Sequence, residues 1–190
     1  MKYAVYVEGK SELLFVADVL QKYSNYDPKV CGLRCINLNA DDFERMNHPV
    51  QGDEQSERFY QIVNVNNDNR VVSKLNKDIR SLLALGYNVV IGLRDVFGET
   101  YKRFTNEQPV IDREIIVKMN GAQSSAINAP EGSDCRLHFA IMEYETWMLA
   151  LIENFVRNGG KNMDELCRQL GIERTEDFET TIYHPYPMVK

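Results

Sequence analysis

The stretch YNVVIGLRDV at residues 87–96 is a nearly continuous apolar run that ends in a charged pair, Arg94 and Asp95. A strand with one face in water alternates apolar and polar residues, whereas a strand covered on both faces does not. Sheets with both faces covered are typically parallel, because the crossover connections place helices on them. The run therefore predicts a buried strand of a mostly parallel sheet.

Strand-like and helix-like segments alternate along most of the chain. Runs of β-branched and aromatic residues predict further strands, and apolar residues at intervals of three and four predict helices. The strands are expected at 3–8, 31–39, 59–65 and 136–142, and the helices at 11–23, 69–85, 112–125, 144–156 and 163–170. Residues 41–58 are polar and predict an exposed excursion with one short helix. This order predicts a single α/β domain whose mostly parallel sheet is flanked by helices on both faces.

The composition argues against several classes of protein. A net charge of −6 over 190 residues disfavours a broad electrostatic grip on duplex DNA, although metal-binding carboxylates would themselves make the charge negative. The four cysteines form no C-x-x-C pair, so reduced thiols in a cytoplasmic protein are expected rather than a zinc site. No apolar run approaches the ~20 residues that span a bilayer, and the start lacks the pattern of a signal peptide.

Acidic residues follow three of the expected strands. Glu8 ends the first, Asp95 follows the apolar run, and Glu143 and Glu145 follow the last. The carboxyl ends of parallel strands meet at one edge of a sheet, where ligands collect, so these carboxylates are expected to converge. Their mutual repulsion would be relieved by a hard divalent cation such as Mg²⁺. An arginine holding one of these acids, with no room for an ion, would rule out this interpretation.

Two other phosphate-handling sites do not fit. The segment Gly9-Lys10-Ser11 supplies only the last half of a phosphate-binding P-loop, and the residues before it form an apolar strand that cannot wrap a phosphate. A phosphotransfer site of the haloacid dehalogenase type needs a second aspartate two residues after the first, and that position is Phe97.

Three motifs resemble those of the TOPRIM domains found in topoisomerases, primases and OLD-type nucleases. VEGKSE at residues 7–12 resembles the VEG-x-SE form of the OLD-type branch, LRDVFG at 93–98 is similar to the later aspartate motif, and EYETWMLAL at 143–151 resembles the E-x-E-x-W-x-L segment of the small OLD-like and RloB-like bacterial families. The resemblance implies a TOPRIM/Rossmann-like domain over 1–158, with 159–190 as its helical tail or cap. It also implies a Mg²⁺- or Mn²⁺-dependent nuclease acting on DNA or RNA in phage defence or mobile-element function, with an ATPase partner protein.

The resemblance also implies roles for individual residues. Glu8 would act in catalysis as a metal ligand or as a general acid or base, and Asp95 would be a catalytic metal ligand. Glu12 would reach the same edge as a further ligand, and Glu143 and Glu145 are candidate ligands of a second metal, of which only one is expected to face the site. Lys10 and Arg94 adjoin these acids and are candidates for contacts to substrate phosphate or for surface ion pairs.

Simpler interpretations remain open for the two main acids. Glu8 suits the positive end of the helix that follows it, and Asp95 suits a turn. The pattern also departs from the family at Val96 and Phe97, where the second aspartate of an Asp-x-Asp pair is absent. Either the acids of EYE at residues 143–145 supply the missing ligand, or the chain is a catalytically inactive module that binds a partner protein or nucleic acid.

Overall fold

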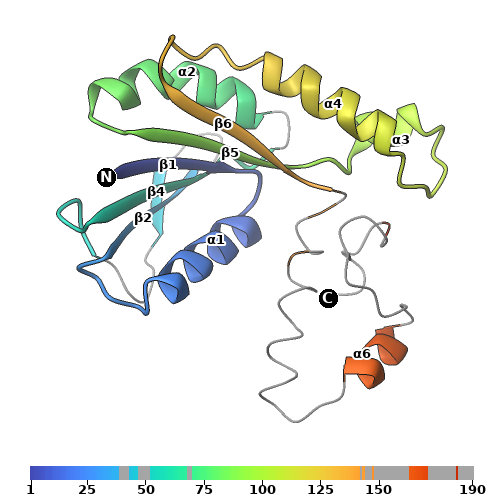
Figure 1. The fold of residues 1–190 in the computed structure, drawn as a ribbon, viewed down its shortest axis with the longest axis horizontal. Helices are drawn as coiled ribbons and strands as arrows, with labels where there is room; N and C mark the ends of the chain where they lie inside the picture. The colour runs from blue at the N-terminus through green and yellow to red at the C-terminus, as the bar shows by residue number, and fades with distance from the viewer. Residues whose placement is uncertain are drawn as a thin grey trace. The chain divides into compact units, whose positions relative to one another are not determined.

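The computed structural model describes residues 1–38, 43–46, 52–67, 70–141, 143, 147, 163–170 and 183. These residues form a six-stranded sheet of order β3-β2-β4-β1-β5-β6 (Figure 1). The strands are β1 (Lys2–Val7), β2 (Cys31–Leu38), β3 (Phe43–Met46), β4 (Arg58–Asn64), β5 (Val89–Asp95) and β6 (Asp134–Ala140). The helices are α1 (Lys10–Tyr23), α2 (Arg70–Ala84), α3 (Glu99–Phe104), α4 (Arg113–Ser125) and α6 (Met163–Leu170).

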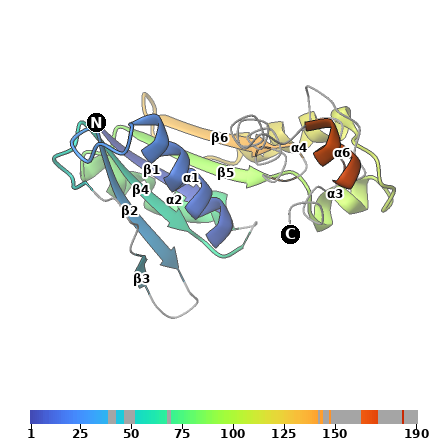
Figure 2. The same ribbon diagram turned by 90° about the horizontal axis from the view of Figure 1, so that it is seen from below.

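The sheet is mostly parallel, as the sequence predicts. β1 pairs in parallel with both β4 and β5, and β4 pairs in parallel with β2. β6 runs in the same direction as β5 (Figures 1 and 2). The exception is the edge strand β3, which pairs antiparallel with β2. The pattern did not predict this strand, and the described part of the polar stretch, 43–46 and 52–58, contains no helix. α3 is a further element that the pattern did not predict.

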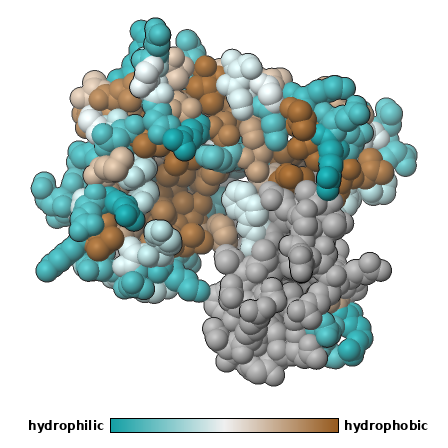
Figure 3. All heavy atoms as spheres, in the orientation of Figure 1, coloured by the Kyte–Doolittle hydropathy of each residue, from teal (hydrophilic) through white to brown (hydrophobic). Residues whose placement is uncertain are grey.

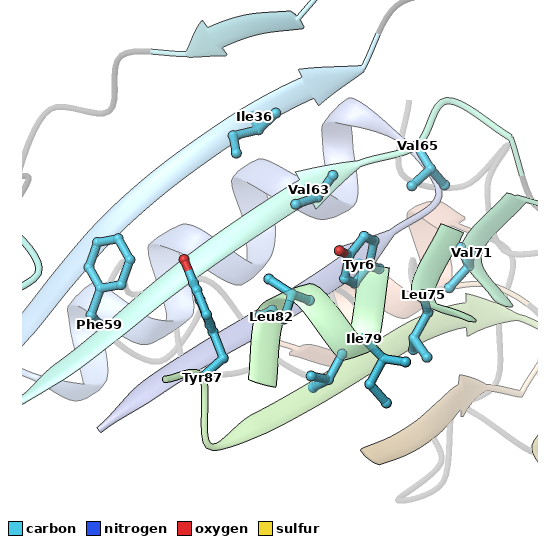
Figure 4. Close-up of a cluster of buried hydrophobic side chains, with 12 residues drawn as sticks. Tyr6, Ile36, Phe59, Val63, Val65, Val71, Leu75, Ile79, Leu82 and Tyr87 are labelled. Carbon is cyan, nitrogen blue, oxygen red and sulfur yellow. The ribbon is translucent and has the colours of Figure 1, made fainter. Parts of the chain in front are cut away.

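Helices cover both faces of the sheet. α1 and α2 lie on opposite faces (Figures 1 and 2), so the predicted fold class is confirmed. On the α2 face, the apolar side of the helix packs on alternate residues of the strands (Figure 4). This cluster contains Val71, Leu75, Ile79 and Leu82 of α2 with Ala4, Tyr6, Ile36, Phe59, Val63, Val65, Tyr87 and Val90.

The α1 face has a second core. Leu13 and Ala17 of α1 pack on Val5, Val7 and other residues of the strands. Two residues of β5, Ile91 and Leu93, contact this cluster but remain half-buried. Figure 3 shows apolar surface in the middle of this face, beside α1. Ala4 and Tyr6 of β1 belong to the core under α2, whereas Val5 and Val7 belong to the core under α1. The strand is therefore buried on both sides.

The chain divides into two compact units. The first comprises Met1–Arg94 and Gly121–His138, and the second comprises Asp95–Asn120 and Phe139–Lys190. The first unit holds α1, α2 and the two cores described above. The described part of the second has its own cluster, built on buried Val96, Tyr101, Ile116 and Met119. None of the described helices is long and apolar enough to cross a membrane.

A glycine on β5 lets α2 approach the sheet closely. A Cβ added to Gly92 would lie 2.6 Å from Leu137 Cδ1 and 3.1 Å from Val71 Cγ1. Distances this short force neighbouring side chains to shift, and close-packed interiors resist such shifts. The absence of a side chain at Gly92 therefore allows the first turn of α2 to pack closely on the sheet.

We expect Gly92→Ala to lower the free energy of unfolding by about 1–3 kcal/mol, because the added methyl overpacks this contact. Urea denaturation of the two proteins measures the difference. The matched control is Gly121→Ala in α4, where a Cβ meets nothing within 4 Å. The control should be neutral or stabilising, by up to about 1 kcal/mol, because alanine favours the helix. Equal effects at the two positions would contradict the packing argument.

Burial in the α1-face core changes the titration of a cysteine. Cys35 is 1% exposed, and burial, with a smaller contribution from Asp18, raises its thiol pKa from the ordinary value of 9.0 to about 11. The unfolded chain loses this proton at lower pH than the folded chain. The contribution of Cys35 to stability is therefore complete below about pH 9 and is lost as the pH rises toward 11.

We accordingly expect the free energy of unfolding to fall between about pH 9 and pH 10.5, with Cys35 contributing at most about 1.4 kcal/mol per pH unit. Urea midpoints measured across this range give the slope. Cys35→Ala should fall less steeply than the wild type, even if its stability at neutral pH is lower. An unchanged slope in this variant would show that Cys35 does not ionise as proposed.

Candidate functional site

Glu8 lies at the carboxyl-terminal edge of the sheet, one residue beyond β1. β1 ends at Val7 rather than at Glu8, a difference of one residue from the prediction. The residue is only 8% exposed. β1 pairs with β5 through Tyr6 and Gly92, so continuing this register by two residues places Glu8 beside Arg94.

Arg94 forms a buried ion pair with Glu8. Its Nε donates to Oε1 of Glu8 at 3.0 Å, and the two side chains are 10% and 9% exposed. The other end of the guanidinium, Nη1, donates to Oε1 of Gln123 in α4. The arginine is thus held at two points, and the carboxylate of Glu8 is neutralised within the protein. The surface ion pair considered from the sequence is in fact a buried one.

This pair bears on the metal hypothesis in two ways. Two buried charges cost several kcal/mol in lost hydration, and apolar residues of the same volume are often as stabilising. A buried ion pair at a ligand-binding edge is therefore weak evidence for stability and better evidence for function. However, Arg94 already relieves the charge of Glu8, so a cation is not required to make this carboxylate tolerable.

The start of α1 brings Glu12 back toward Gly9. The helix begins at Lys10, and Gly9 is its N-cap in an extended conformation, with φ of −136°. A Cβ added to Gly9 would lie 2.5 Å from Oε2 of Glu12, so the carboxylate folds back over the glycine. The carboxylate of Glu12 therefore lies beside Gly9, the residue that follows Glu8, and its role as a metal ligand stays a prediction. Lys10 is exposed at the first position of the helix.

Three asparagines lie at the same edge of the first unit, at the ends of β2 and β4. The side chain of Asn64 is fully buried, and its Nδ2 donates to Oδ1 of Asn37 at 2.6 Å and to Oδ1 of Asn66 at 2.7 Å. The backbone N–H of Asn66, which has φ of 58°, donates to Oδ1 of Asn64. The sequence analysis did not single out these residues. The only signal was their recurrence in INLN and VNVNN, directly after apolar strand residues.

The other predicted ligands belong to the second unit or lie outside the described residues. Asp95 is the last residue of β5 and is half-buried. Glu143 is half-buried, and Glu145 lies outside the described residues. Because Glu8 belongs to the first unit and Asp95 to the second, the convergence of their carboxylates stays a prediction.

Apolar packing occupies the positions where the family pattern has its second aspartate. Val96 is 3% exposed within the core of the second unit. Phe97 packs against this core, with its ring edge-on to Tyr183 at 5.3 Å between centroids and with Lys102 Nζ 4.9 Å from its own centroid. These side chains contribute to packing and cannot supply a metal ligand.

The described residues contain no group of three or more acidic, histidine or cysteine side chains that could hold a metal ion. The metal site expected from the sequence combines Glu8 of the first unit with Asp95 and Glu143 of the second unit and with Glu145, which lies outside the described residues. No family model, curated protein or solved structure matches this chain. The TOPRIM resemblance therefore depends on its three sequence motifs and on the fold class.

We expect Arg94→Met to lower the free energy of unfolding by about 3–5 kcal/mol, because it leaves the carboxylate of Glu8 buried without its partner. The double variant Glu8→Gln/Arg94→Met should recover most of this loss, since neither charge remains. Chemical denaturation of the single and double variants measures both effects.

The control is Arg136→Met on β6, whose ion pair with Asp134 has side chains 61% and 38% exposed. Its cost should be far smaller than that of Arg94→Met, because ion pairs between exposed side chains contribute little to stability. An equally small cost for Arg94→Met, or a double variant no more stable than the single one, would show that the buried pair is not coupled as described.

Proposed function

We propose that this chain is a metal-dependent phosphodiesterase, a TOPRIM-like nuclease of the OLD-like or RloB-like kind. The observation that carries the proposal is the burial of the Glu8 carboxylate at the carboxyl-terminal edge of a mostly parallel α/β sheet. Ligands of such sheets bind at this edge. A charged side chain that is buried there despite the cost of lost hydration is a candidate for a catalytic or binding role. The three motifs noted in the sequence add support of a different kind, since each follows or overlaps a strand end.

The proposed ligands for Mg²⁺ or Mn²⁺ are Glu8, Asp95 and one of Glu143 and Glu145, with Glu12 as a further candidate. Carboxylate oxygens are the donors that these hard cations prefer. The bound cation would supply charge neutralisation at the phosphate and a more acidic water.

Arg94 gains a specific role in this proposal. A guanidinium binds a phosphate through two parallel hydrogen bonds, and the Nε and Nη1 groups of Arg94 now engage Glu8 and Gln123. We propose that substrate phosphate competes with Glu8 for Arg94. The exchange would release the carboxylate of Glu8 toward the cation while the substrate gains an arginine contact. Lys10, exposed at the start of α1, would add a second positive charge.

The broader setting depends on the resemblance alone. Small OLD-like and RloB-like proteins suggest phage defence or mobile-element function with an ATPase partner. We extend this setting to the chain as part of the same proposal.

A second candidate function is favoured by two observations at the same positions. Arg94 neutralises Glu8 without a metal, and Val96 and Phe97 fill the place of the second aspartate with apolar packing. Both features suit a catalytically inactive TOPRIM-like module that binds nucleic acid or a partner protein.

Cleavage assays with single- and double-stranded DNA and RNA test the first function. We expect cleavage in Mg²⁺ or Mn²⁺ and none in EDTA. Glu8→Gln and Asp95→Asn should each reduce the rate by about 100-fold or more, because a metal ligand contributes several kcal/mol to the transition state. The matched control Glu131→Gln alters an exposed acid in the loop before β6 and should cleave at the wild-type rate.

The melting temperature with and without metal separates the two functions. A ligand bound by the folded state alone raises the apparent stability, so the nuclease should melt at a higher temperature in Mg²⁺ than in EDTA. The rise should disappear in Glu8→Gln. Absence of both cleavage and this rise would reject the nuclease and leave the inactive module.

A further inference from the structure

The exposed side of α2 carries a row of positive charges. Its members, Arg70, Lys74, Lys77 and Arg80, are called here the basic ridge. At 100° per residue, the first three lie within an arc of about 60°, and Arg80 lies about 60° further round. Arg70, Lys77 and Arg80 are exposed, and Lys74 is half-buried. The ridge is the face opposite the apolar residues that pack on the sheet.

One acid lies beside the ridge, and its carboxylate is already engaged. Asp78 accepts a hydrogen bond from the buried hydroxyl of Tyr6 at 2.8 Å. It also pairs with Lys74 at 2.8 Å. Among the described residues, no ion pair involves the side chains of Arg70, Lys77 or Arg80. Three exposed cations on one helix face therefore keep their charge without an acidic partner in the described part of the chain.

This concentration of charge contrasts with the chain as a whole. The protein has a formal charge of −6, yet α2 contains four cations and one acid. With a rise of about 1.5 Å per residue, Arg70 and Lys77 are about 10 Å apart along the helix, and Arg70 and Arg80 about 15 Å. Phosphates in an extended nucleic-acid strand are separated by several ångströms, so the ridge can contact two or three of them. The net charge of the chain hides this local feature.

The ridge begins at the edge of the sheet where the candidate site lies. Arg70 is the first residue of α2, which follows the carboxyl end of β4. Its neighbour Val71 contacts the sheet at Gly92. Arg94 is two residues beyond Gly92 on the same strand and hence on the same face. The positive row therefore starts near the Glu8–Arg94 pair and runs away from it along the helix, within the first unit.

We infer that the basic ridge binds the phosphodiester backbone of a nucleic acid and leads it to the edge that carries Glu8 and Arg94. The inference deepens the proposed function and depends on it for the nature of the polyanion. Lysine and arginine contacts to phosphates supply affinity without sequence preference. An anionic membrane fits less well. A helix that binds a membrane inserts its apolar face, and the apolar face of α2 is buried in the core.

The test is nucleic-acid binding without cleavage. Fluorescence anisotropy in EDTA follows binding of a fluorescein-labelled mixed-sequence strand, single-stranded or duplex, at several concentrations of KCl. The ridge variant is Arg70→Gln/Lys77→Gln/Arg80→Gln, and glutamine preserves helix propensity. We expect it to bind about tenfold or more weakly at low salt. The slope of log K against log salt should decrease in magnitude by roughly 2–3.

The matched control is Lys29→Gln/Arg103→Gln/Arg113→Gln, which removes the same charge from three exposed residues elsewhere. It should bind nearly as the wild type does, and urea denaturation should show that both triple variants remain folded. Equal losses in the two variants would overturn the inference, because affinity would then follow net charge. Absence of any binding by the wild type would overturn it as well.

Two further measurements separate this inference from the nuclease proposal and from membrane binding. Ridge-dependent binding by a wild-type protein that does not cleave would support the ridge and reject only the nuclease. If the ridge variant cleaves as fast as the wild type at substrate concentrations below saturation, the nuclease is supported and the inference about the ridge is rejected. Ridge-dependent binding to vesicles of phosphatidylcholine and phosphatidylserine, without binding to nucleic acid, would overturn the inference and identify a membrane surface.

Discussion

The whole arrangement depends on β1 being buried from both sides. Ala4 and Tyr6 belong to the core under α2, while Val5 and Val7 belong to the core under α1. A strand with alternate residues in two different cores has neither freedom to slip nor a polar face. Since β4 and β5 pair with it in parallel, the next residue after β1 is delivered to the carboxyl-terminal edge. That residue is Glu8, and its burial follows from the strand that precedes it.

The placement of an acid there creates the central chemical problem of the molecule. A carboxylate at this depth needs a partner, and the adjacent strand supplies Arg94 rather than another acid. Gln123 then fixes the far end of the guanidinium. The same pair supports two interpretations, a structural neutralisation and a phosphate-binding group that can exchange partners. Stability measurements address the first, and activity and metal dependence address the second.

α2 links this edge to the surface of the protein. Its apolar side closes the core over β1, β4 and β5, and Gly92 allows its first turn to lie close to the sheet. Its other side carries the basic ridge, with the single acid bound to Tyr6 and Lys74. Net charge is a poor guide to nucleic-acid binding in such a chain, because cations gathered on one helix act locally. The influence of acids elsewhere falls off over the screening length of physiological salt, about 8 Å.

The sequence by itself determined most of the described elements and the class of the fold. The unbroken apolar run of β5 and the helical spacing of Leu75, Ile79 and Leu82 reflect local packing requirements, which appear directly in the order of residues. It also identified Glu8 as a strand-end acid and placed Glu12 beside it. The four-residue strand β3 escaped prediction because its pairing with β2, rather than its own composition, makes it a strand.

Only the tertiary structure decided which side chains meet. Glu8 and Arg94 are 86 positions apart, and Asn37 and Asn64 are 27 apart, so no local pattern reports these contacts. The basic ridge needed the structure for a different reason. Its residues recur at helical spacing in the sequence, but only the docking of α2 shows which side faces water and that its acid is already paired. Strand order and helix docking decide contacts, and both depend on the whole chain rather than on any segment of it.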